Sequence, residues 1–125
     1  MDALVAGQIA LPAAGARFDV AFEGVVRGPR LNGTVVGVDY IHVRADGRFQ
    51  LHIHACITTD DNENIAFFGE GVSIVEPGTS IKRLRENMTF MSASNKYAWL
   101  NAIQGWGLGT VDAQKGEVRI KTYAA

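Results

Sequence analysis

The chain has 125 residues, a common size for one domain, and its 12 basic and 13 acidic residues give a formal net charge of −1. It has no long run of positive charge of the kind that nucleic-acid binding requires, and no apolar run approaches the roughly 20 residues that cross a bilayer as a helix. The single cysteine, Cys56, cannot form an internal disulfide, and Asp2 stands where a signal peptide would be basic. We therefore expect one domain over residues 1–125 in the cytoplasm, with neither nucleic acid nor a membrane as its partner.

The first half of the chain is predicted to form short β-strands separated by turns. In residues 17–24, RFDVAFEG, large apolar side chains occupy every second position, which is the period of a strand with one buried face. A turn signal, Asn-Gly or Asp-Gly, stands at the start of each of the next two alternating segments, 32–43 and 45–59. These segments are therefore predicted to be antiparallel neighbours.

The second half continues this pattern with one exception. Residues 64–75, NIAFFGEGVSIV, form a further strand candidate, whereas residues 80–87, SIKRLREN, are predicted to form a short helix. Three more strands are predicted within 88–94, 97–111 and 116–124. Strands at intervals of about ten residues, with glycine in the turns, are typical of antiparallel sandwiches and barrels, so the predicted fold class is all-β.

All three histidines lie in one predicted hairpin, residues 39–56, DYIHVRADGRFQLHIHAC. If Asp46 and Gly47 form a two-residue turn, Asp39 pairs directly with His54, and paired residues share one face of the sheet. In that register one face is polar and the other is mostly apolar. The polar face carries Asp39, His52 and His54, and the apolar face carries His42 with Phe49, Leu51, Ile53 and Ile57.

The pairing of Asp39 with His54 predicts proton chemistry. A carboxylate beside a histidine fixes one tautomer of the ring and raises its pKa, as in a general acid–base pair. We therefore predict that Asp39, His52 and His54 are catalytic. The two histidines could also begin a zinc, iron or copper site, but no glutamate follows in the strand and no later histidine completes it, so no metal is predicted. A third interpretation is that the histidines are ordinary half-exposed strand residues.

The order of several short motifs resembles the DUF3237 family, also called UPF0311. Residues 24–61, GVVRGPRLNGTVVGVDYIHVRADGRFQLHIHACITTDD, contain Gly-Pro-Arg, Asp-aromatic, Arg-x-Asp-Gly and Thr-x-Asp motifs in the family's order. YAWLN at 97–101 and a closing strand with Tyr123 are similar to its C-terminal half, so the resemblance covers roughly residues 15–125. It implies a closed antiparallel β-barrel, calycin-like or up-and-down, of about eight or more strands, which forms a homodimer or a higher homo-oligomer.

Either face of the hairpin could line such a barrel. We expect the face of Asp39 to line a polar pocket, with the apolar face covered by another subunit. The alternative is a filled core made by the apolar face, with His52 and His54 outside and His42 and Arg44 inside.

Later segments add candidates for the same pocket. Glu70 shares a face with Ala66 and Phe68 and is the only charged residue in segment 64–75, so it is predicted to be a further catalytic acid or base. Four residues are predicted to bind the ligand: Tyr40 from the family-like motif, and Tyr97, Trp99 and Asn101 on one face of a strand.

The sequence leaves three functions open, and it does not decide whether the protein is an enzyme. The first is a cofactor-independent enzyme, a lyase, isomerase, hydratase or cyclase, acting on a small organic substrate that is aromatic if Trp99 stacks on it. No cofactor is predicted, because the sequence has no nucleophile elbow, P-loop or dinucleotide-binding glycine pattern. The second is a non-catalytic, lipocalin-like protein, whose partner is also a small-molecule ligand. The third is a structural oligomeric barrel.

Overall fold

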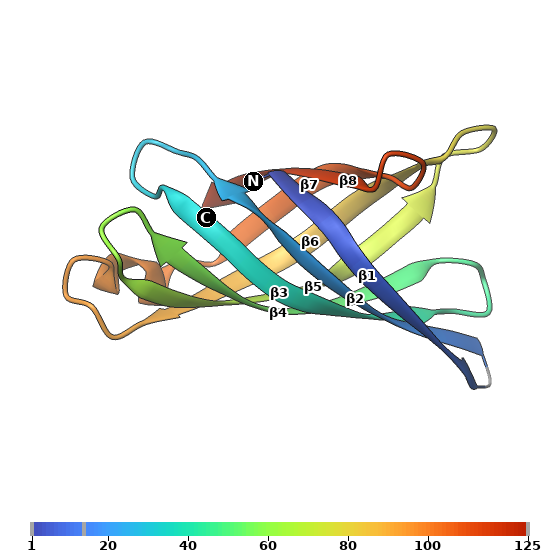
Figure 1. Ribbon diagram of the computed structural model, residues 1–125, viewed down its shortest axis with the longest axis horizontal. Helices are drawn as coiled ribbons and strands as arrows, with labels where there is room; N and C mark the ends of the chain where they lie inside the picture. Colours follow the sequence, from blue (N-terminus) through green and yellow to red (C-terminus); the bar gives the residue numbers. More distant parts are fainter. Residues whose placement is uncertain (1, 14, 125) are drawn as a thin grey trace.

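The computed structural model describes the backbone of residues 2–13 and 15–124, with side chains from Arg17 onward. Figure 1 shows long strands wound around one barrel, with the loops gathered at its two ends. The elements follow in the order β1 (Asp2–Ala13), β2 (Gly15–Val26), β3 (Gly33–Val43), β4 (Phe49–Thr59), β5 (Asn64–Val75), β6 (Ile81–Ser92), the 3-10 helix η1 (Ala98–Ala102), β7 (Gly105–Asp112) and β8 (Glu117–Ala124). The predicted all-β fold class is confirmed.

Each strand pairs antiparallel with the next strand in the chain, so short turns suffice to connect them. The ring closes where β1 also pairs with β8. This seam has only three residue pairs, whereas β2 and β3 are paired over eleven. The seam is therefore the least extensively hydrogen-bonded contact of the barrel.

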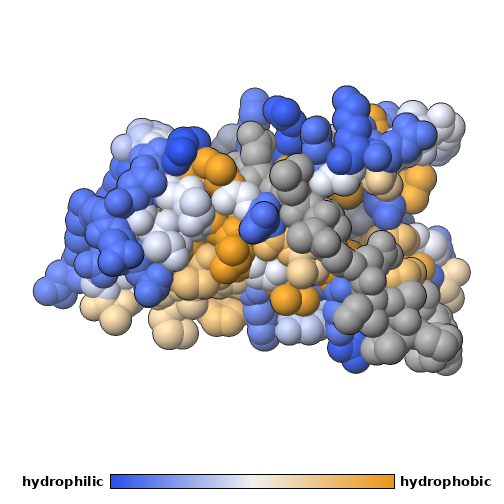
Figure 2. Space-filling model, in the orientation of Figure 1, coloured by the Kyte–Doolittle hydropathy of each residue, from blue (hydrophilic) through white to orange (hydrophobic). Residues whose placement is uncertain are grey.

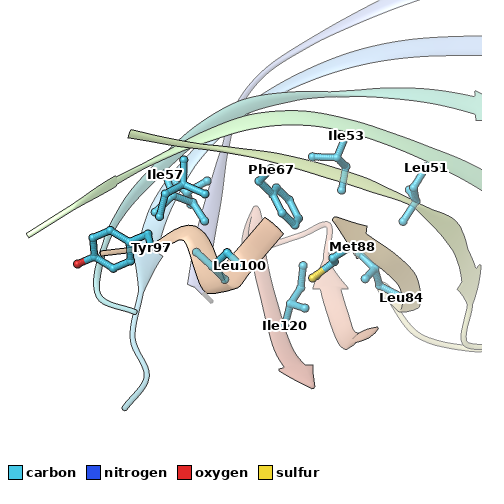
Figure 3. Close-up of a cluster of buried hydrophobic side chains, with 11 residues drawn as sticks. Leu51, Ile53, Ile57, Phe67, Leu84, Met88, Tyr97, Leu100 and Ile120 are labelled. Carbon is cyan, nitrogen blue, oxygen red and sulfur yellow. The ribbon is translucent and has the colours of Figure 1, made fainter. Parts of the chain in front are cut away.

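The interior is built from every second residue of the strands, because successive side chains of a strand point to opposite faces. In β4, Leu51, Ile53 and Ile57 are buried, while the alternate residues Gln50, His52 and His54 are exposed. The apolar face of β4 is thus part of the inner face. In Figure 3, Ile53 and Phe67 lie on one side of the interior and Met88 and Ile120 on the other. Full burial of one such side chain contributes roughly 1.5–3 kcal/mol.

The prediction of a helix at 80–87 is wrong, because most of this segment belongs to strand β6. Leu84 and Glu86 point inward, and Arg83 and Arg85 point outward. The strand pairs with β5 on one side and with β7 on the other along most of its length. These two ladders satisfy the backbone and override the helical propensity of the charged residues.

The prediction of one strand over 97–111 is also wrong at its start, where η1 precedes β7. The Asn101 side chain accepts a hydrogen bond from the Ser92 backbone N–H at 2.7 Å and donates one to the Ser92 carbonyl at 3.0 Å. The Tyr97 hydroxyl donates a hydrogen bond to Asp61 at 2.7 Å. These bonds hold η1 against the end of β6 and the turn between β4 and β5, so Tyr97, Trp99 and Asn101 do not alternate along a strand.

The turn between β3 and β4 is longer by one residue than predicted. The Arg44 N–H donates to the Arg48 carbonyl at 2.8 Å, and the Gly47 N–H donates to the Arg44 carbonyl at 2.9 Å. Gly47 has a φ of 85°. This is the three-residue hairpin loop, a type I turn followed by a left-handed residue. The register is therefore shifted by one residue from the predicted one, and Asp39 pairs with Ile53 instead of His54.

Replacing Gly47 tests this turn. Gly47→Ala should lower the free energy of unfolding by about 1 kcal/mol, because a side chain disfavours left-handed backbone, while no atom lies within 4 Å of the added carbon. Urea denaturation would measure the change. Gly28→Ala is the matched control, since Gly28 is not left-handed and the nearest atom would lie 3.5 Å away. A Gly47→Ala protein as stable as the parent would contradict the three-residue turn.

Candidate active site inside the barrel

The observed register separates the residues predicted to act together. Asp39 is buried, with 8% of its surface exposed, and faces the interior, while His52 and His54 are exposed on the outer face. The prediction that Asp39 lies opposite His54 is wrong, and so is the prediction that these three residues line one polar pocket. The alternative of a filled apolar core is right in placing His52 and His54 outside, but wrong in placing His42 and Arg44 inside, since both are exposed.

The two histidines belong instead to a cluster on the outer surface. The His54 ring packs edge-on against Tyr40 and Phe68, with centroid distances of 5.8 and 5.5 Å, and lies 5.1 Å from the His52 ring. His52 pairs across the sheet with Glu70, and its Nδ1 lies 3.7 Å from the Glu70 carboxylate. The prediction that Ala66, Phe68 and Glu70 share a face is confirmed, and that face is the outer one. Tyr40 and Glu70 are therefore outside the barrel too.

The interior holds a different acidic pair, Asp39 of β3 and Glu86 of β6. One Asp39 oxygen accepts a hydrogen bond from the backbone N–H of His52 at 2.9 Å. Glu86 is 3% exposed, and neither of its carboxyl oxygens has a hydrogen-bond partner within the described part of the chain. An unpartnered carboxyl group in an apolar interior is costly, which marks Glu86 as a functional candidate.

Sequence reasoning missed Glu86 because its segment was predicted to be helical. One signal was present: Glu86 stands between Leu84 and Met88 in a series of alternate residues that otherwise faces the core. A single acid in such a series is the pattern of a buried carboxyl on a strand.

Glycines on the two neighbouring strands leave room for the Glu86 side chain. Its cross-strand partners are Gly71 in β5 and Gly107 in β7. A methyl group added at Gly107 would lie 2.9 Å from the Cγ of Glu86 and 2.4 Å from the Cε of Met88. The space beside the carboxyl therefore depends on the absence of a side chain at Gly107.

Burial sets the charge of this pair. Removal from water, and to a lesser extent the negative charge of Asp39, raises the pKa of Glu86 to about 8. Burial raises the pKa of Asp39 to about 6, against the opposing effect of its hydrogen bond from His52. At pH 7 Glu86 is therefore mainly protonated and Asp39 mainly ionised. The interior then holds one proton donor and one proton acceptor.

Two cavities lie inside the barrel near this pair, although Glu86 lines neither and Asp39 lines only the smaller. The larger, of about 560 Å³, opens among the 27–31 loop, η1 and the end of β8, and the smaller, of about 80 Å³, includes Asp39 in its wall. Along β6, Leu84 lines the smaller cavity and Met88 lines the larger one, so Glu86 stands between them. Figure 2 shows hydrophilic side chains over the loops at the left end of the barrel and hydrophobic ones just inside them.

Of the four predicted ligand contacts, Trp99 alone lines the larger cavity. The guanidinium group of Arg30 lies over its ring, 3.7 Å from the centroid. Tyr97 and Asn101 hold η1 in place, as described above, and Tyr40 belongs to the outer cluster.

The described residues contain neither a candidate metal site nor a membrane-spanning helix. No three side chains of histidine, cysteine, aspartate or glutamate converge there as a metal site would require. No helix in that part of the chain is long and apolar enough to span a membrane.

Comparison with known proteins places the chain in a family. The DUF3237 family, described as a protein of unknown function, matches residues 16–125, so the chain belongs to it, as its motifs predicted. A curated relative, the hydroalkoxylation enzyme phnH of Penicillium herquei, is 33% identical over 85 residues. These cover 67% of this chain and 50% of the relative, so the chain spans about half the length of that protein.

Solved structures show the same fold. A protein of unknown function from Clostridium acetobutylicum superposes with a TM-score of 0.88 over 99% of this chain and 93% of that one, at 25% identity. An enzyme from Penicillium herquei superposes with a TM-score of 0.67 over 99% of this chain and 90% of that one, at 20% identity.

The raised pKa values predict how stability depends on pH. Between pH 5 and 8 the folded protein holds more protons than the unfolded chain, because both carboxyl groups titrate above their ordinary values of 3.8 and 4.5. The free energy of unfolding should therefore fall as the pH rises, by about 3 kcal/mol from Glu86 alone. Glu86→Gln should remove most of this fall, as measured by urea denaturation at several pH values.

Glu70→Gln is the matched control, since it removes an exposed carboxylate and should keep the parent's pH profile. Parallel profiles for the parent and Glu86→Gln would show that Glu86 ionises normally in the folded protein, against this description of the site.

Proposed function

We propose that the protein is an enzyme that binds a small organic molecule inside a closed barrel and transfers protons with Asp39 and Glu86, without a cofactor. The observation that carries the proposal is the buried pair of carboxyl groups, one protonated and one ionised at neutral pH. The same interior holds a cavity of about 560 Å³, which is lined by Met88, the next inward-facing residue after Glu86 on β6. Pairs of titratable groups whose pKa values are set apart by their surroundings supply an acid and a base in many active sites.

The reaction we propose is the addition of a hydroxyl group across a carbon–carbon double bond of the same molecule. The curated relative is named a hydroalkoxylation enzyme, and that name describes this type of addition. The addition loses no atom and needs no oxidant or reductant, so a proton donor and a proton acceptor are sufficient. It belongs to the cyclase-type chemistry predicted from the sequence, but uses Asp39 with Glu86 instead of the histidines.

The protonation states of Glu86 and Asp39 assign the roles of acid and base. Protonated Glu86 gives its proton to one alkene carbon, and the substrate oxygen forms a bond to the other carbon. The hydroxyl proton passes to ionised Asp39. Because Glu86 has the higher proton affinity, the proton then returns from Asp39 to Glu86, and the starting state is restored.

The acid strength of Glu86 limits which alkenes can serve as the substrate. A carboxyl group with a raised pKa is a weak proton donor, so the alkene must be activated by conjugation to a carbonyl group or to an electron-rich ring. The substrate therefore carries a conjugated alkene and a hydroxyl group that can reach it.

A ligand in the larger cavity approaches Glu86 past Met88, which lines that cavity next to the acid. Methionine is unbranched and has three rotatable bonds, so this side chain can move aside with little strain. Ile120 lines both cavities, so Met88 and Ile120 are the side chains that we expect to rearrange when the ligand reaches the carboxyl group.

The large cavity also favours a second function, a non-catalytic ligand-binding protein, which would need the cavity but not the two carboxyl groups. The predicted homo-oligomer and the predicted cytoplasmic location stay predictions.

Turnover in heavy water tests the proposed reaction. We expect the protein to cyclise members of a panel of 2-alkenylphenols and hydroxy-enones, with one deuterium placed on carbon in the product. Asp39→Asn and Glu86→Gln should each lower kcat by about 100-fold or more, while binding of the same compounds stays nearly unchanged. Mass spectrometry would measure the label, and fluorescence quenching would measure the binding.

His54→Ala and Glu70→Gln are the controls, because both residues lie outside the barrel, and they should retain full turnover. Loss of turnover in His54→Ala with normal turnover in Asp39→Asn would overturn the assignment of the site. Binding of the panel without any turnover would favour the non-catalytic protein.

A further inference from the structure

The mouth of the larger cavity is positively charged. Arg27, Arg30 and Lys121 line it, and no aspartate or glutamate among the described residues does so. The rest of the wall is mainly apolar and includes Phe67, Phe90 and Trp99. The cavity therefore joins an apolar body to a cationic rim, which is the complement of an amphipathic anion.

Lys121 follows the inward-facing Ile120 in β8, so its side chain points to the outer face. Only Arg27 and Arg30 therefore present their charges to the cavity. Arg30 forms no ion pair in the described part of the chain, whereas Arg27 lies 3.9 Å from the exposed Asp60. An exposed pair at that distance contributes little. Because the guanidinium group of Arg30 rests on the Trp99 ring, its planar donors are held at the rim.

The two ends of the site have opposite charge. Arg30 stands at the mouth, while Asp39 and Glu86 are buried in the barrel interior beyond the lining of this cavity. An anionic group on a ligand is attracted to the mouth and repelled by the ionised Asp39. The charges therefore bind such a ligand in one orientation, with its apolar part toward Met88 and Glu86.

We propose that the molecule bound by this barrel is an apolar, ring-containing carboxylic acid, with its carboxylate at Arg30 and its ring system against Trp99 and the apolar wall. A carboxylate fits the fork of an arginine through two parallel hydrogen bonds. A volume of about 560 Å³ lies within the range of sites for drug-sized ligands, which is roughly 300–1,000 Å³. This inference rests on the proposed function and names the substrate class of the same site.

Titration calorimetry with two probes of nearly equal shape tests the proposal. 2-Naphthoate carries the carboxylate, and 2-naphthamide is its neutral counterpart. At pH 7 and low salt the parent protein should bind 2-naphthoate about tenfold more tightly than 2-naphthamide. Arg30→Gln should remove most of this preference.

Lys115→Gln is the matched control, because it removes one exposed positive charge at the opposite end of the barrel and should keep the preference. Equal affinity of the parent for the two probes would overturn the inference, and so would an equal loss in Lys115→Gln and Arg30→Gln. Absence of binding by both probes would also overturn it.

The experiment separates this inference from the proposed reaction. A preference for 2-naphthoate that depends on Arg30 would support the ligand class, even if the turnover experiment showed no deuterium on carbon. Equal binding of the two probes together with label incorporation that depends on Glu86 would leave the proposed reaction standing and remove only the ligand class.

Discussion

The structure depends on the cost of placing two carboxyl groups inside one apolar barrel. Asp39 and Glu86 are both buried among aliphatic side chains, and a buried charge is expensive unless it is paired or hydrogen-bonded. Asp39 has one hydrogen bond, from the backbone of His52, and Glu86 has none within the described residues. Glu86 avoids the cost of a buried charge because it keeps its proton at neutral pH. That proton makes the interior a candidate for acid–base chemistry, because no hydrogen bond within the described residues accounts for the burial of Glu86.

The barrel also divides its polar residues between two surfaces. The histidines and Glu70, which drew attention in the sequence, lie on the outer face with Tyr40 and Phe68. The inner face presents mainly aliphatic side chains around the carboxyl pair, and Arg27 and Arg30 stand at one mouth. A ligand that enters there meets cations first, then an apolar wall and then the acids, so the order of charges along the barrel fixes its direction.

Much of this fold was predictable from the sequence. The alternation in 17–24, 32–43, 45–59 and 64–75 marks strands because one face of each is buried, and the family motifs extend the assignment to the whole domain. The register of the hairpin was not predictable from Asp-Gly alone, since that pair occurs in both two-residue and three-residue loops. Because the observed loop is one residue longer than the predicted loop, Asp39 pairs with Ile53 instead of His54.

The remaining errors arose where tertiary contacts decide the local structure. The charged segment 80–87 favours a helix when taken alone, but ladders on both sides hold most of it as a strand, and this change placed Glu86 in the interior. The 3-10 turn at 98–102 depends on bonds between Asn101 and the backbone of Ser92, which no local pattern reveals.

The central claim is that Glu86 is protonated and Asp39 ionised at neutral pH. Carbon-13 NMR of the side-chain carboxyl carbons, assigned with the Glu86→Gln and Asp39→Asn variants, tests it most directly. We predict that the Glu86 carbon titrates near pH 8 and the Asp39 carbon near pH 6. Titration of both carbons at the ordinary values near pH 4 would contradict the claim.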